Sequence, residues 1–217
     1  MAEPTPPSPP SASARVYARL KDDILEGRHP GGSFVTEGEV AEATGVSRTP
    51  VREALLRLEA EGLLRLYPKK GALVVPVSVD DARDVLEARL VIEQWAAGAM
   101  WVRRAEVMME LEALLAQMGA ARGAGDVGAF VRHDRRFHEV IVAAAGNDVL
   151  ARTYQGLRDR QLTIVATQLR MSERRLEHAL RGHTELLELL RSGTKAAFQT
   201  ATRTHVEDAM ARLQGAR

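Results

Sequence analysis

The sequence contains no cysteine, which excludes a disulfide framework and a metal site built from thiolates. Its apolar runs are far too short to span a bilayer, so we expect no membrane partner. The first residues are rich in proline and serine rather than basic and then apolar, which argues against a signal peptide. We therefore expect a cytoplasmic protein that begins with a disordered tail over residues 1–10, MAEPTPPSPP.

The chain also has almost no net charge, with a formal value of +1 at pH 7. Within residues 1–76, ten Lys and Arg residues balance ten Asp and Glu residues, whereas a nonspecific DNA binder would be broadly basic. Positive charge is concentrated instead in Arg65, Lys69 and Lys70. If this part binds nucleic acid, we expect sequence-specific binding with a limited number of phosphate contacts.

The most informative pattern lies in residues 39–64, which predict two short helices joined by a tight turn. Gly45 stands where a helix would end in the left-handed conformation that glycine tolerates best. Ser47 is a good N-cap for the next helix, and Pro50 is acceptable in a first helical turn. An apolar stripe then recurs at three- and four-residue spacing, formed by Val51, Ala54, Leu55 and Leu58.

Three polar residues at the start of the second helix, Arg48, Thr49 and Arg52, fall off this stripe. A recognition helix presents its N-terminal residues to base edges in the major groove, where arginine can pair bidentately with guanine. The spacing therefore favours a DNA-reading helix. The alternative is an ordinary helical hairpin with a solvated basic face, because short helix-turn-helix patterns have many false positives.

Two short β-prone runs follow, at residues 63–66 and 72–77, and a turn over residues 67–71 separates them. The predicted hairpin carries Lys69 and Lys70 at its tip, where they would reach phosphate or the minor groove. This arrangement is typical of the wing of a winged helix-turn-helix.

The segment from Ile24 to Leu64, and above all SRTPVREAL at residues 47–55, resembles the DNA-binding domain of the GntR family of bacterial transcription regulators. The resemblance implies that the matching positions and the wing contact double-stranded operator DNA. These positions are Arg48, Thr49, Pro50, Arg52, Lys69, Lys70 and Gly71. The family often has a DNA-contacting arginine near the start of the second helix, where this chain has Glu37, Gly38 and Glu39, so that contact is expected to be absent.

The domain organisation is predicted to be simple and mainly α. A winged helix-turn-helix covers residues 11–77 and includes an amphipathic helix over residues 14–26. Ser78 to Asp81 resembles a capping box, and residues 78–217 contain no convincing strand. We expect an all-α six-helix bundle there, with helices over residues 80–102, 104–120, 126–145, 148–169, 172–192 and 194–213.

Histidines are the informative residues of the bundle. Asp134 and His138 are four apart on one helical face, and His183 and His205 belong to the last two helices. If those helices pack around the third, one carboxylate and three imidazoles would converge, a donor set suited to zinc, nickel or manganese with positions left open. A bundle histidine is more often a surface or core residue, so spacing alone leaves both interpretations open.

The stretch DRRFHEVIVAAAGNDVL at residues 134–150, with RGHTELLELLRSG and ATRTHVEDAM, is similar to the all-helical effector-binding domain of the FadR-like subfamily, in its shorter, vanillate-regulator-like form. The resemblance implies that a divalent metal, with zinc expected, is held by Asp134, His138, His183 and His205. Arg89 resembles a position that pairs with an effector carboxylate, although it could equally be a surface arginine bridging Glu93.

A catalytic zinc commonly needs a nearby glutamate as general base, as in H-E-x-x-H, and the sequence has no such pair. We therefore expect the metal to anchor a small organic acid. The predicted function is a ligand-responsive repressor that binds a palindromic operator as a homodimer and is not an enzyme. The alternatives are a metalloenzyme fused to a DNA-binding head and a regulator whose metal is purely structural.

Overall fold

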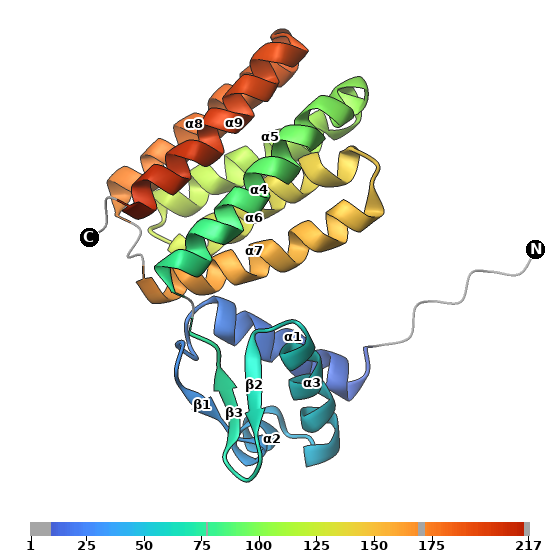
Figure 1. The fold of residues 1–217 in the computed structure, drawn as a ribbon, viewed down its shortest axis with the longest axis vertical. Helices are drawn as coiled ribbons and strands as arrows, with labels where there is room; N and C mark the ends of the chain where they lie inside the picture. Colours follow the sequence, from blue (N-terminus) through green and yellow to red (C-terminus); the bar gives the residue numbers. More distant parts are fainter. Residues whose placement is uncertain (1–9, 77, 169–171, 215–217) are drawn as a thin grey trace, which may run out of the picture. The chain divides into compact units, whose positions relative to one another are not determined.

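The computed structural model describes residues 10–76, 78–168 and 172–214 (Figure 1). The chain divides into two compact units, residues 1–76 and 77–217. The predicted tail lies, apart from Pro10, outside the described residues. The mainly α fold with a small β-sheet is confirmed, and no described helix is long and apolar enough to cross a membrane.

The first unit combines helices with a small antiparallel sheet, in which β3 lies between β1 and β2. Its elements are α1 (Ala12–Leu25), β1 (Phe34–Val35), α2 (Glu37–Thr44), α3 (Arg48–Ala60), β2 (Leu64–Tyr67) and β3 (Gly71–Val74). The predicted hairpin is present, with Leu64 opposite Val74 and Tyr67 opposite Gly71. The sequence did not predict β1, which adds a third strand beside β3.

The predicted apolar stripe of α3 faces the core of this unit, together with residues of α1 and the sheet. Its four residues are all buried: Val51, Ala54, Leu55 and Leu58. Gly45 ends α2 in the left-handed conformation, with φ 68°, as predicted. Ser47 stands at the N-cap of α3, but its side chain forms no capping hydrogen bond. A capping box is found instead at α2, between Thr36 and Glu39.

The second unit, within the described residues, is entirely helical. Its elements are α4 (Val79–Ala99), the 3-10 turn η1 (Met100–Arg103), α5 (Arg104–Gly123), α6 (Val127–Ala144), α7 (Asp148–Gln168), α8 (Glu173–Ser192) and α9 (Lys195–Gln214). The predicted capping box is present between Ser78 and Asp81. The first predicted helix reached residue 102, but its α-helical part ends at Ala99 and the chain continues as η1. The predicted end of the fourth helix, Leu169, lies outside the described residues.

Helix α6 lies at the centre of this second unit, because α4, α5 and α7 all pack against it (Figure 1). Helix α8 packs against α5 and α9, and α9 packs against α4. The largest apolar core contains Phe137 of α6, Leu186 of α8 and Phe198 of α9. Helix α6 and the two consecutive helices α8 and α9 thus meet around one interior region, which contains the histidines considered next.

Candidate metal centre and DNA-binding surface

Three histidines from three helices meet inside the helical unit: His138 of α6, His183 of α8 and His205 of α9. One ring nitrogen of each lies within 4.8 Å of one nitrogen of the other two. His138 and His183 are buried, whereas His205 is half-buried. The packing of α8 and α9 beside α6 therefore brings together the three imidazoles that the sequence placed on these helices.

Asp134, one turn before His138, lies at the edge of this cluster. Its Oδ1 is 3.3 Å from His183 Nε2, and its Oδ2 accepts a hydrogen bond from Arg158 Nη2 at 2.5 Å. Burial alone would raise the pKa of Asp134, but the positive charge of Arg158 holds it well below its ordinary value. Asp134 is therefore an anion, and Oδ1 is its oxygen on the histidine side.

The nitrogens on the far sides of two rings fix how these rings are oriented. His183 Nδ1 donates to the carbonyl oxygen of Ala179 at 2.7 Å, and His138 Nδ1 lies 2.9 Å from Glu93 Oε2. A carbonyl and a carboxylate can only accept, so Nδ1 carries the proton in each neutral ring. Carbonyl and carboxylate groups in this position are typical of histidines that bind metals, because they fix the tautomer and aim the other nitrogen.

The two remaining nitrogens face each other closely. His138 Nε2 and His183 Nε2 are 3.1 Å apart, and in the tautomers just derived both present lone pairs. Burial lowers the pKa of His183 to about 4, so this ring is neutral near pH 7. Burial and the two other histidines also lower the pKa of His205. With Nδ1 as the donor of each ring, the two Nε2 lone pairs converge and repel one another unless a cation lies between them, so these residues fit a divalent metal.

Glu93 belongs to a buried ionic network behind His138. Arg89 donates to Glu93 Oε1 through Nε at 2.8 Å and through Nη2 at 2.7 Å, and the Tyr154 hydroxyl donates to the same oxygen at 2.6 Å. The pairing of Arg89 with Glu93 that the sequence suggested is therefore present, but both side chains are buried rather than on the surface. Although burial raises the pKa of Glu93, the positive charge of Arg89 beside it holds the pKa well below its ordinary value.

Several residues of this centre were not predicted from the sequence. Glu93 was predicted only as a surface partner of Arg89, and no role was predicted for Tyr154 and Arg158 of α7. The available signal was the spacing of four between Tyr154 and Arg158, which puts both on one face of α7. Gly182 was also missed. A Cβ there would lie 2.6 Å from His205 Nδ1, so glycine lets this ring approach α8.

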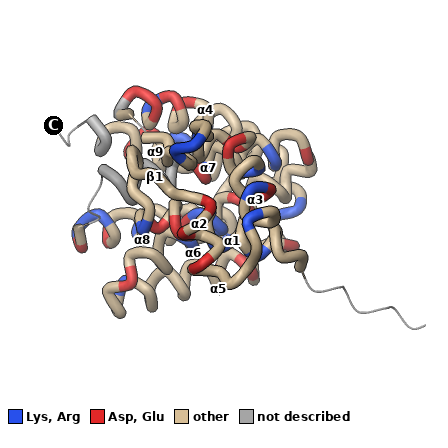
Figure 2. The backbone as a smooth tube through the Cα atoms, turned by 90° about the horizontal axis from the view of Figure 1, so that it is seen from below, with Lys and Arg blue, Asp and Glu red and all other residues tan. Residues whose placement is uncertain are grey.

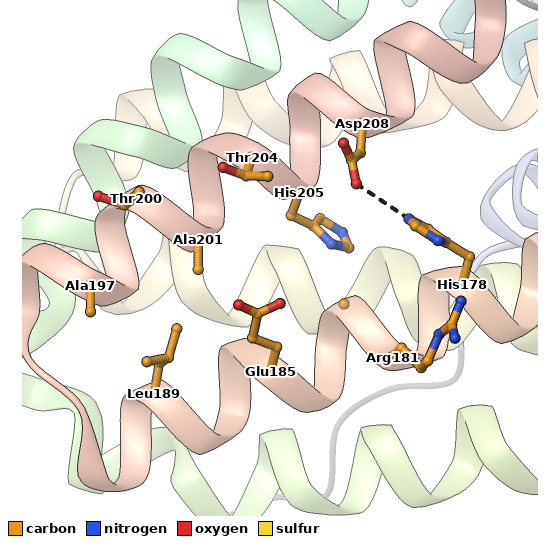
Figure 3. Close-up of a pocket in the computed structure, with 11 residues that line it drawn as sticks. His178, Arg181, Glu185, Leu189, Ala197, Thr200, Ala201, Thr204, His205 and Asp208 are labelled. Atoms are coloured by element: carbon orange, nitrogen blue, oxygen red, sulfur yellow. Dashed lines mark hydrogen bonds and ion pairs between the residues drawn. The ribbon is translucent and has the colours of Figure 1, made fainter.

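A groove of about 600 Å³ between α8 and α9 leads to His205 (Figure 3). Its polar lining includes Arg181, Glu185, Thr200 and Thr204. At one end His178 Nε2 lies 3.3 Å from Asp208 Oδ2, so His178 has a partner away from the three clustered histidines. His205 is thus the histidine of the cluster that borders this groove.

In the first unit, the residues predicted to read DNA lie at the exposed start of α3. Arg48, Thr49 and Arg52 are exposed, and Pro50 is half-buried in the first turn. Figure 2 shows basic residues along α3 and acidic residues on the neighbouring α2. Arg52 is paired across this boundary, because its Nε donates to Glu37 Oε1 at 2.8 Å.

The predicted wing residues lie in the turn between β2 and β3. Lys69 and Lys70 are exposed, and Lys69 has a left-handed backbone with φ 64°. Gly71 begins β3 with φ 104°, and a Cβ there would lie 2.7 Å from the carbonyl oxygen of Val35. Gly71 is therefore required for the close approach of β1, whereas the two lysines are available to a partner.

Comparisons with known proteins cover both units. Residues 12–74 match the model of the bacterial regulatory proteins of the gntR family, and residues 84–208 match the FCD domain. An HTH-type transcriptional regulator of Agrobacterium vitis is 36% identical over 142 residues, which cover 62% of this chain and 83% of that protein. The "Probable D-xylose utilization operon transcriptional repressor" of Paenarthrobacter nicotinovorans is 31% identical, covering 88% of this chain and 85% of that protein.

A solved structure has the same fold over almost the whole chain. The structure of E. coli McbR/YncC superposes with a TM-score of 0.83, covering 95% of this chain and 99% of that chain. The two sequences are 22% identical. At that identity the likeness concerns the fold, which agrees with the mainly α architecture described above.

Proposed function

Since this chain belongs to the GntR family of bacterial regulatory proteins and carries an FCD domain, we propose that it is a repressor that leaves its operator when a small organic acid binds at a metal in the helical unit. Members of this family are transcription regulators that bind DNA, and the relatives named above are regulators rather than enzymes. A regulator of this kind acts on the chromosome, in the cytoplasm.

The observation that carries the proposal is the pair of Nε2 atoms of His138 and His183, which face each other 3.1 Å apart. Contacts of the two Nδ1 atoms with Glu93 and with the carbonyl oxygen of Ala179 orient the two rings. With His205 and the anionic Asp134, this pair would hold a divalent ion, for which we propose zinc, with nickel and manganese as the alternatives that the same donors accept. A bound ion of this kind supplies a Lewis acid with positions open to a carboxylate.

The residues around the centre support a binding role. Asp134 Oδ2 is held by Arg158, which leaves Oδ1 on the side of the histidines. The groove between α8 and α9 would admit a small acid to the side of His205. Arg89 belongs to the proposed effector site, but its pairing with Glu93 favours an indirect role, in which Arg89 holds the carboxylate that orients His138.

The first unit would read the operator through Arg48, Thr49 and Arg52, with Pro50 shaping the first turn of α3. Lys69 and Lys70 would contact phosphate or the minor groove, and Gly71 would set the base of the wing. One DNA-binding unit of this size offers few specific contacts, so we propose a homodimer that binds two half-sites about one helical turn apart. An acid that binds the released arrangement a hundredfold better than the DNA-bound one would shift the equilibrium by about 2.7 kcal/mol.

Thermal unfolding of the full chain with a panel of small carboxylic acids tests the proposal. The metal-loaded protein should gain stability with one class of acid, and removal of the metal by a chelator should abolish that gain. His183→Ala should behave like the chelated protein, whereas His178→Ala, five residues away on α8, should still bind metal. If chelation lowers stability but no acid has any effect, the metal is structural and the carboxylate proposal is wrong.

A further inference from the structure

An acidic residue of α2 contacts the arginine that is expected to read DNA. Glu37 is the first residue of α2, and its Oε1 and Oε2 lie 2.8 and 3.4 Å from Arg52 Nε and Nη2. The capping box between Thr36 and Glu39 fixes the start of α2 and therefore the direction in which Glu37 extends. Among the residues that the structure describes, Glu37 is the one acidic side chain paired with Arg52.

The contact uses one edge of the guanidinium group. Nε and Nη2 form the side edge, which Glu37 occupies, whereas Nη1 and the second hydrogen of Nη2 form the end of the fork. Bidentate recognition of guanine O6 and N7 needs two parallel donors, which the end of the fork supplies. Arg52 can therefore keep its bond to Glu37 and present two donors to a base at the same time.

We propose that Glu37 is a positioning residue that holds the Arg52 side chain in the orientation that contacts one guanine, and so sets the sequence specificity of the first unit. This inference rests on the proposed operator binding. A free arginine side chain samples many rotamers and can turn to the nearest phosphate instead of a base. The bond to Glu37 limits that choice before DNA arrives, so less freedom is lost when the base contact forms.

The charge of Glu37 acts in the same direction. A carboxylate beside the DNA surface repels phosphates, and it neutralises part of the attraction that Arg52 would exert on any duplex. The pair should therefore weaken nonspecific binding while it retains the contact with guanine. Specificity is the difference between these two affinities, so both effects increase it.

The pair is suited to a test because the fold does not depend on it. The side chain of Arg52 is 69% exposed and that of Glu37 is 29% exposed, and exposed ion pairs contribute little to stability. Variants at either position should therefore fold. Glu42→Gln is a matched control, because it removes one negative charge from an exposed position of the same helix without changing the contact with Arg52.

The experiment begins with a pool of random DNA duplexes, from which the full-length wild type selects its preferred site. Binding of that site, of single base-pair variants and of an unrelated duplex is then measured for wild type, Glu37→Ala, Arg52→Ala, the double variant and Glu42→Gln, at one salt concentration. We expect Glu37→Ala to lose about tenfold in discrimination at one G·C pair. It should also bind the unrelated duplex more tightly than wild type.

Two further results are expected. Arg52→Ala should lose discrimination at the same G·C pair, and the double variant should be no worse than Arg52→Ala, because the two residues act as one unit. Glu42→Gln should keep the discrimination of the wild type.

The inference is wrong if Glu37→Ala keeps full discrimination at the pair that Arg52 reads. It is also wrong if Glu37→Ala and Arg52→Ala affect different base pairs, since Glu37 would then read a base itself. A wild type that enriches no sequence would overturn operator binding, and the proposed function would fail together with the inference.

Discussion

Gly182 decides how closely His205 can approach α8. A Cβ at this position would lie 2.6 Å from His205 Nδ1 and 3.2 Å from its Cε1, closer than these atoms can come without a shift. Glycine inside a helix is less favourable than alanine by up to about 1 kcal/mol. Glycine at position 182 therefore lowers the stability of α8 slightly, but it leaves the space that the His205 imidazole occupies.

We expect Gly182→Ala to displace His205 and to lower metal affinity about 10- to 100-fold, a loss similar to that of removing a residue that orients a ligand. Competition with a coloured chelator measures this affinity. Gly119→Ala is the control, because nothing lies within 4 Å of a Cβ there and the substitution should leave metal binding unchanged. Equal affinities for the two variants would contradict the assigned role of Gly182.

Part of the candidate centre could be predicted from single residues. His138 and Asp134 share a helical face by spacing, and histidine is rare enough in this chain to be noticed. Glu93 could not be recognised in this way, and the spacing of Tyr154 and Arg158 puts both on one face of α7 without showing what that face contacts. A charged residue on an amphipathic helix gives no sign of whether it faces solvent or a polar interior, and here the answer depends on how α4 and α7 pack against α6.

At the scale of elements, the start of α2 matters for both stability and DNA reading. Thr36 accepts a hydrogen bond from the backbone of Glu39, and the Glu39 side chain accepts one from the backbone of Thr36. These bonds satisfy two groups that a helix start leaves without partners. They also fix the residue next to Thr36, which is Glu37.

Thr36→Ala should therefore lower the free energy of unfolding of the first unit by about 1 kcal/mol, as is usual for the loss of an N-cap. Urea unfolding of the full chain measures the change. Ser47→Ala, at the N-cap of α3, should cost less, because Ser47 forms no side-chain capping bond. A larger loss for Ser47→Ala than for Thr36→Ala would count against this account of the two caps.

The long helices could be predicted because their apolar residues recur over many turns and because glycines mark the breaks after α5, α6 and α8. Strand β1 could not, since two residues carry no periodic signal and their pairing with Leu73 and Ala72 is made by backbone groups. The 3-10 turn after Ala99 was also not predicted, because no glycine or proline interrupts the sequence between Ala99 and Arg103. The periodicity of apolar residues therefore predicts helices of several turns better than it predicts short elements.

At the scale of the whole molecule, the two units have separate hydrophobic cores. The residues of the first core all precede Pro76, and those of the other clusters all follow Val77. The candidate metal ligands join α6, α8 and α9 within the second unit. Metal bound there would stabilise the folded form of that unit and leave the first core unchanged.

Calorimetry of the full chain should therefore show that chelation moves the unfolding of the helical unit alone. Metal at about a hundred times its dissociation constant adds roughly 2.7 kcal/mol, which corresponds to a Tm change on the order of 10 °C for a unit of this size. His183→Ala should unfold at the temperature of the chelated protein. A parallel fall in both units would mean that the first core depends on the metal, contrary to expectation.

The separation of the cores also bears on how such a protein can change over time. A substitution that alters the groove between α8 and α9 leaves the packing of the head intact, and a new residue on α3 leaves the bundle intact. Genetic recombination near residue 77 can therefore join the DNA-binding unit to a different effector-binding unit. A biosensor could be assembled in the same way.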